Sequence, residues 1–167
     1  MIKRLLVLAA LAAALRISGL LPFQTNDVAR LKPVEALVVS IKDGQVTLNG
    51  EDCRGVGEDW SAALQDLRQS AEGTVFLGTT EQVVLCGEAK SVLQDIVESE
   101  ALRPAAVVVY CPEQDLDPKE AAAYLSAHDA GLTLQKVQSA IVRREFVLLP
   151  VVRKTEGGLR LDGTQHR

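Results

Sequence analysis

Aromatic residues are scarce in this 167-residue chain, at 4% of the sequence. Proteins that bind single-stranded nucleic acid usually stack bases on several aromatic rings, so the composition disfavours that class. Basic residues are also few. Outside residues 1–23, 15 lysines and arginines (18 − 3) stand against 22 acidic residues. A protein that binds a phosphate backbone needs the opposite balance, so we expect no nucleic-acid partner.

Histidine is almost absent, which removes the raw material for most catalytic triads. His166 lies in the polar tail, and His128 is expected at the end of a helix, where a cationic residue is favourable. The chain also lacks the phosphate-loop, dinucleotide-binding, metalloprotease and nucleophile-elbow motifs. We therefore predict a protein that is not an enzyme, and assign no catalytic, cofactor-binding or metal-ligating residue.

One acidic cluster needs a separate interpretation. It comprises Glu113, Asp115, Asp117 and Glu120. The cluster lacks the glycine and the terminal glutamate of a calcium loop. We expect a solvated connection between a strand and a helix rather than a cation site.

The three cysteines are widely and irregularly spaced, unlike a zinc knuckle or an even disulfide framework. Cys86 and Cys111 each end an apolar run, which favours buried small hydrophobes over ligands. A single disulfide with one remaining thiol stays open. Cys53 lies in a glycine-flanked polar segment beside Arg54, which could lower its pKa. A thiol-dependent redox protein or small enzyme using Cys53 is therefore an alternative function.

Residues 1–23 form a basic and apolar leader. Two basic residues near the start precede an uninterrupted apolar stretch, residues 5–15, which is the pattern of a signal peptide. Arg16 then interrupts the run, so the purely apolar part is about half of the ~20 residues that a spanning helix needs. Three alanines at 12–14 offer a cleavage site. We expect residues 1–23 to be a cleaved signal peptide or a retained membrane-anchor helix, with the domain outside the cytoplasm.

The sequence beyond residue 28 predicts alternating strands and helices. Strand patterns occur at residues 34–41, 45–48, 74–77, 81–86, 105–111, 146–152 and 159–161. Apolar residues at helical spacing predict helices that begin near residues 59, 92, 118 and 132. The valine-rich run 105–111 indicates a central strand buried on both faces. This order predicts an α+β fold, a mixed β-sheet with helices packed on it, in a single domain over residues 28–163 with a polar tail at 164–167.

Local signals place several element boundaries and one core residue. Asp43-Gly44 is a strong hairpin turn signal. Either Glu58 or Asp59 can cap a helix whose apolar stripe includes Trp60, which we expect to be a core anchor. Asp117-Pro118 starts a further helix. Two adjacent arginines, residues 143 and 144, are too few to predict binding to anionic lipid on their own.

Several phrases together resemble the N-terminal part of the Ger(x)C family, the C subunits of spore germinant receptors. Residues 36–44 are similar to the family's strand and "GIDK" turn, and residues 60–70 to its "ALxxLxxxS" helix. Residues 75–88 resemble its "LFxGH…VVVIGE" stretch, although Thr79 stands where the histidine is expected. Residues 96–110 and 148–163 resemble its later helix–strand and hairpin segments. The resemblance spans residues 28–163, in a chain less than half the usual family length.

The resemblance implies a function and a place in the cell. It implies a non-enzymatic, membrane-associated extracytoplasmic protein that contacts membrane-embedded receptor subunits during spore germination or sporulation. Ile17-Ser18-Gly19-Leu20 resembles a lipobox in which Leu20 occupies the position of the lipid-bearing cysteine. Thioether lipidation is chemically impossible there, so any anchor must be peptidic. A structural protein of the cell envelope or spore, unconnected to receptors, is a second alternative.

Overall fold

A computed structural model describes residues 31–164 of the chain. The chain divides into two units, residues 1–31 and 32–167, and the second is described here. It is an α+β unit with a mixed sheet and helices packed on it, as the sequence predicts. The predicted leader at 1–23 and all but the first residue of the predicted tail lie outside the described residues.

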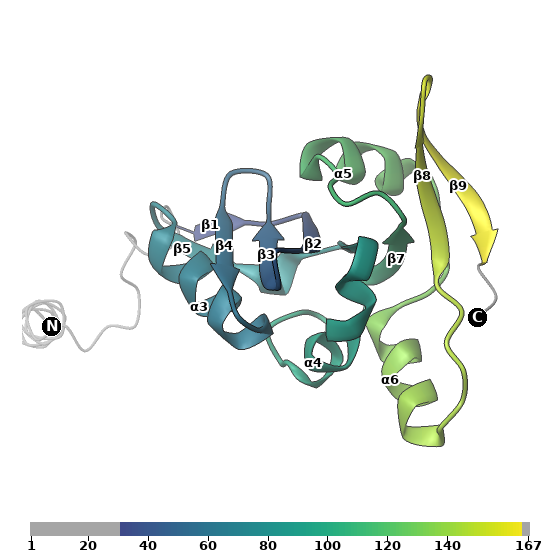
Figure 1. Ribbon diagram of the computed structural model, residues 1–167, viewed down its shortest axis with the longest axis horizontal. Helices are drawn as coiled ribbons and strands as arrows, with labels where there is room; N and C mark the ends of the chain where they lie inside the picture. Colours follow the sequence, from purple (N-terminus) through teal and green to yellow (C-terminus); the bar gives the residue numbers. More distant parts are fainter. Residues whose placement is uncertain (1–30, 165–167) are drawn as a thin grey trace, which may run out of the picture. The chain divides into compact units, whose positions relative to one another are not determined.

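Seven strands form the main sheet, in the order β4-β3-β2-β6-β7-β8-β9 (Figure 1). Their bounds are β2 Ala36–Lys42, β3 Gln45–Asn49, β4 Arg54–Gly57, β6 Gln82–Cys86, β7 Val107–Cys111, β8 Pro150–Thr155 and β9 Gly158–Thr164. The four central strands β2, β6, β7 and β8 run parallel, whereas the outer pairs are antiparallel. A short separate sheet joins β1 (Leu31–Pro33) and β5 (Thr74–Phe76).

Strands β2, β6 and β7 contribute buried residues to both faces of the sheet, and their valine-rich sequences reflect this. In β7, Val108 packs into one core, while Val109 and Cys111 pack into the other. The neighbouring strand β6 is buried along its whole length. The prediction that residues 105–111 contain a central strand is confirmed, and this strand pairs with β6.

The two faces of the sheet carry different helices. The helices α3 (Trp60–Ser70), α4 (Leu93–Glu98) and α6 (Leu134–Arg143) contribute to one core, which we call the large core. Helix α5 (Pro118–Ala127) packs alone on the opposite face, over the small core. A 3₁₀ segment, Gly87–Val92, precedes α4 and adds Ala89 and Val92 to the large core.

Several boundary predictions are confirmed. Asp59 caps α3 by accepting a hydrogen bond from the Ala62 amide at 2.8 Å. Asp117 caps α5 with Pro118 at its first position. Asp43 and Gly44 adopt φ angles of 52° and 76° in the turn between β2 and β3, the conformation that a tight hairpin requires. A second hairpin joins β8 to β9, with residues 156–157 in its turn.

Strand β4 is not among the strands that the sequence predicts. Gly55 and Gly57 lie in this strand, and a Cβ at either position would lie 2.3 Å from the backbone of Ala63 in α3. Glycine is therefore required by the close approach of strand and helix rather than by a loop.

The predicted strand at residues 146–152 is wrong in its first half. Strand β8 begins only at Pro150, and residues 145–149 have no regular structure. Arg144 adopts a left-handed conformation that ends α6 and redirects the chain before the apolar run begins. Phe146 is consequently 96% exposed instead of forming part of a sheet.

Candidate functional site at the carboxyl edge of the parallel strands

The parallel strands end together at one edge of the sheet, where open α/β sheets commonly bind ligands. Strand β2 ends at Lys42, β6 at Cys86, and β7 at Cys111. The connection from β7 to α5 crosses this edge and contains the acidic cluster identified in the sequence. This connection is therefore the candidate functional site.

Two cysteines lie side by side at this edge. Cys86 and Cys111 are register partners on neighbouring parallel strands, and they are 1% and 0% exposed. Both are free thiols. A hydrogen bond with Cys86, together with burial, raises the pKa of Cys111 far above its ordinary value. The Cys111 thiol therefore stays protonated and is a poor nucleophile, in agreement with the prediction of buried small hydrophobes.

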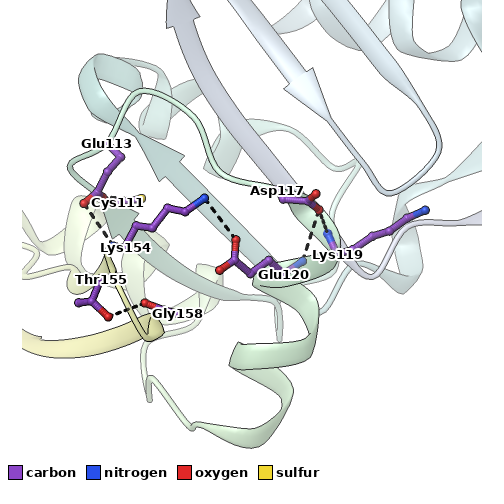
Figure 2. A network of polar contacts seen from close by, with 8 residues as sticks. All are labelled: Cys111, Glu113, Asp117, Lys119, Glu120, Lys154, Thr155 and Gly158. Atoms are coloured by element: carbon purple, nitrogen blue, oxygen red, sulfur yellow. Dashed lines mark hydrogen bonds and ion pairs between the residues drawn. The ribbon is translucent and has the colours of Figure 1, made fainter.

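Glu113 connects the thiol to the next strand (Figure 2). Its Oε2 accepts a hydrogen bond from the Cys111 Sγ at 3.0 Å, and its Oε1 accepts one from the Lys154 amide of β8 at 3.2 Å. Burial alone would raise the pKa of Glu113. The hydrogen bonds from Cys111, from its own backbone and from Lys154 outweigh burial and lower that pKa. Glu113 is therefore a charged acceptor that joins β7 to β8.

The rest of the acidic cluster is paired with cations or backbone. Asp115 lies 2.8 Å from the Lys42 Nζ, and Glu120 lies 3.6 Å from the Lys154 Nζ. Asp117 accepts hydrogen bonds from the first amides of α5 (Figure 2). The segment connects a strand to a helix, as expected, and Asp115 and Asp117 are exposed. Among residues 31–164, no group of three or more histidine, cysteine, aspartate or glutamate side chains is arranged to hold a metal ion.

Cys53 is the thiol on which the alternative function depends. It is half-buried and immediately precedes β4. Burial raises its pKa, and the nearby Glu51 carboxylate raises it further. The expectation that Arg54 lowers this pKa is wrong, because the desolvation and the acidic neighbour dominate. A thiol with a raised pKa holds little thiolate at neutral pH and reacts slowly.

Two other singled-out residues have structural roles. Trp60 is 4% exposed and lies in the large core, as predicted. His128 forms the C-terminal cap of α5, stacks on Tyr124 with ring centroids 4.1 Å apart, and contacts the Tyr124 carbonyl through Nδ1.

Sequence reasoning missed the contact between Cys111 and Glu113. Its only signal was the two-residue spacing at the end of a strand, which does not specify a hydrogen bond. The arrangement as a whole is a closed set of hydrogen bonds and ion pairs that fixes the β7–α5 connection. It leaves neither an activated nucleophile nor a poised general base among the residues described above.

Comparison with protein-family models, with curated proteins and with solved structures finds no match to this chain. Within the part of the chain that the structure describes, none of the helices has the length and apolarity to cross a bilayer.

Proposed function

We propose that this protein is a non-enzymatic, membrane-associated extracytoplasmic protein similar to germinant-receptor C subunits. It acts through protein–protein contacts with membrane-embedded subunits during spore germination or sporulation. Residues 1–23 direct the chain to the membrane, either as a signal peptide or as a peptide anchor.

The observation that carries the proposal is the resemblance of residues 75–88 to a Ger(x)C stretch. In this chain the segment contains β5, a 3₁₀ turn at Leu77–Thr79 and the central strand β6. It thus contributes to the middle of the fold. The resemblance at residues 36–44 covers β2 and its turn into β3, and β2 is the strand that pairs with β6.

The chemistry of the carboxyl edge, and that of Cys53 outside it, supports a role in binding rather than catalysis. Glu113, Asp115 and Glu120 are each engaged by a partner. The pKa of Cys53 and that of Cys111 are both raised, so neither thiol is activated. These features favour a protein contact over the thiol-dependent alternative.

Affinity purification tests the proposal directly. The full chain, tagged after residue 167, is purified from detergent-solubilised spore membranes, and co-purifying proteins are identified by mass spectrometry. We expect multispan receptor subunits in the eluate. A control chain that lacks residues 1–23 should be lost from the membrane fraction and should not recover them.

Two other results would overturn the proposal. Recovery of the full chain in spore membranes without any receptor subunit would favour the structural envelope protein. Alkylation of Cys53 faster than that of free cysteine would favour the thiol-dependent alternative, since a raised pKa predicts slower alkylation.

A further inference from the structure

Two large apolar side chains are exposed at the end of α6, in a chain where aromatic residues make up only 4% of the sequence. Val142 is 78% exposed and Phe146 is 96% exposed. Phe146 is one of only three phenylalanines in the sequence. Single exposed hydrophobic residues are ordinary on protein surfaces. The exposure of these two side chains therefore does not by itself identify a binding site.

The backbone of Arg144 is a further unusual feature of this end of α6. Arg144 adopts a left-handed conformation with a φ of 58° and closes α6, its amide donating to the Ala140 and Ile141 carbonyls. The Glu145 amide donates to the Ala140 carbonyl at 2.8 Å, which completes a Schellman-type end. Glycine is the usual residue at this position because any Cβ is unfavourable there. Arginine at this position therefore costs some stability relative to glycine.

The charge at this end of α6 differs from that of the rest of the domain. Arg143 and Arg144 are adjacent and exposed, and Arg143 shares a groove of about 280 Å³ with Lys136 and Glu145. Residues 24–167 as a whole hold 15 basic against 22 acidic residues. An acidic domain with a basic end is oriented by an anionic surface, since that surface attracts the end and repels the remainder.

We propose that Val142, Arg143, Arg144 and Phe146 form a docking tip for the interface of an anionic lipid bilayer. Phe146 and Val142 enter the boundary between headgroups and acyl chains, and the two arginines contact lipid phosphates. Phenylalanine with flanking basic residues suits this boundary. Helix α6 and the chain that leads from it towards β8 carry the tip (Figure 1). The inference rests on the proposed function only in requiring a nearby membrane.

A fluorescence experiment on the full chain tests the docking tip. A Phe146→Trp variant is reconstituted into vesicles of phosphatidylcholine and phosphatidylglycerol in equal parts, with brominated acyl chains as quenchers. We expect quenching well above that of the wild-type chain, whose single Trp60 is buried. A matched Glu156→Trp variant, at the exposed β8–β9 turn, should show little quenching. Vesicles of phosphatidylcholine alone should quench the Phe146→Trp variant less.

An Arg144→Gly substitution in the Phe146→Trp background separates folding from docking. Glycine relieves the left-handed backbone, so the Tm should rise. The ratio of docked to undocked tip should fall about fivefold, since an arginine near an anionic surface contributes roughly that factor. A higher Tm together with weaker docking cannot result from a folding defect.

Three results would overturn the inference. The first is no quenching of the Phe146→Trp variant; if the chain still floats with the vesicles, the proposed membrane association stands without the tip. The second is equal quenching in vesicles with and without phosphatidylglycerol, or unchanged quenching after Arg144→Gly. Either result would mean that the arginines do not contact lipid. The third is an emission shift that depends on protein concentration without lipid, which would identify a second copy of the chain as the occupant.

Discussion

The two faces of the sheet are held in different ways. The large core contains 22 buried residues from the sheet, from α3, α4 and α6, and from the short segments between them, whereas the small core contains 10. On the small-core face, α5 adds polar attachments to its burial. Asp117 caps its first turn, Lys154 pairs with Glu120, and the Tyr124 hydroxyl accepts a hydrogen bond from the Leu161 amide of β9 at 2.7 Å.

The two faces therefore differ in the kind of interaction that stabilises them. Burial of apolar area is insensitive to salt and to pH, whereas exposed ion pairs are screened and weak. The large core should therefore decide whether the domain folds, and the polar attachments should decide how firmly α5 stays on it. The carboxyl edge belongs to the second category, since its charged groups connect strands to α5.

The largest expected effect comes from a truncation in the large core. Leu67 of α3 is fully buried in the large core, so Leu67→Ala removes packed atoms and leaves a cavity. We expect a loss of about 3–4 kcal/mol in the free energy of unfolding. Urea denaturation measures it. A loss below about 1 kcal/mol would mean that α3 is not part of the cooperative core.

A matched truncation on the other face should cost less. Leu125 in α5 is 6% exposed over the small core. Leu125→Ala should lower the free energy of unfolding by about 2–3 kcal/mol, because a thinly covered site collapses more easily around a cavity. Denaturation under the same conditions provides the comparison. A cost equal to or above that of Leu67→Ala would break the distinction between the two faces.

Removing the N-terminal cap of α5 tests how much the polar attachments stabilise this helix. Asp117→Ala leaves the Lys119 and Glu120 amides without their acceptor and should cost about 1 kcal/mol. Hydrogen exchange of α5 amides should accelerate more than that of α3 amides. Asp59→Ala, which removes the cap of α3, is the matched control. Equal acceleration in both helices after Asp117→Ala would contradict local attachment.

The smallest effect should depend on pH. The pKa of Glu113 lies below its ordinary value of 4.5, so its ionised form stabilises the fold. That contribution is present above pH 4.5 and is lost as the pH falls through the lowered value. Glu113→Gln should therefore lower the free energy of unfolding at neutral pH by less than about 1 kcal/mol, which appears as a slightly lower Tm. Below the lowered pKa, the two Tm values should converge. A constant difference in Tm across this range would exclude charge as the cause.

Much of the fold could be predicted from the sequence because its signals are local. The turn at Asp43-Gly44, the caps Asp59 and Asp117, and the valine run in β7 each depend on neighbouring residues. The failures depend on distant ones. Strand β4 is not predicted, because glycine at position 55 is required by the approach of the α3 backbone and not by its neighbours in sequence.

The candidate site was less predictable for the same reason. Burial of Cys86 and Cys111 follows from apolar runs, but their side-by-side register requires the order of strands in the sheet. The raised pKa of Cys53 depends on burial and on Glu51, not on the adjacent Arg54 that the sequence emphasises. The exposure of Phe146 depends on the left-handed Arg144, which an apolar run does not indicate.

The location of the domain is the central claim, and labelling in intact cells tests it most directly. A Glu156→Cys variant of the full chain places a thiol on the exposed β8–β9 turn, and the wild-type chain controls for labelling of Cys53. An extracytoplasmic, membrane-held domain predicts labelling by a membrane-impermeant maleimide before lysis, with the labelled chain in the membrane fraction. Labelling only after lysis, or a labelled chain confined to the cytosolic fraction, would contradict the account.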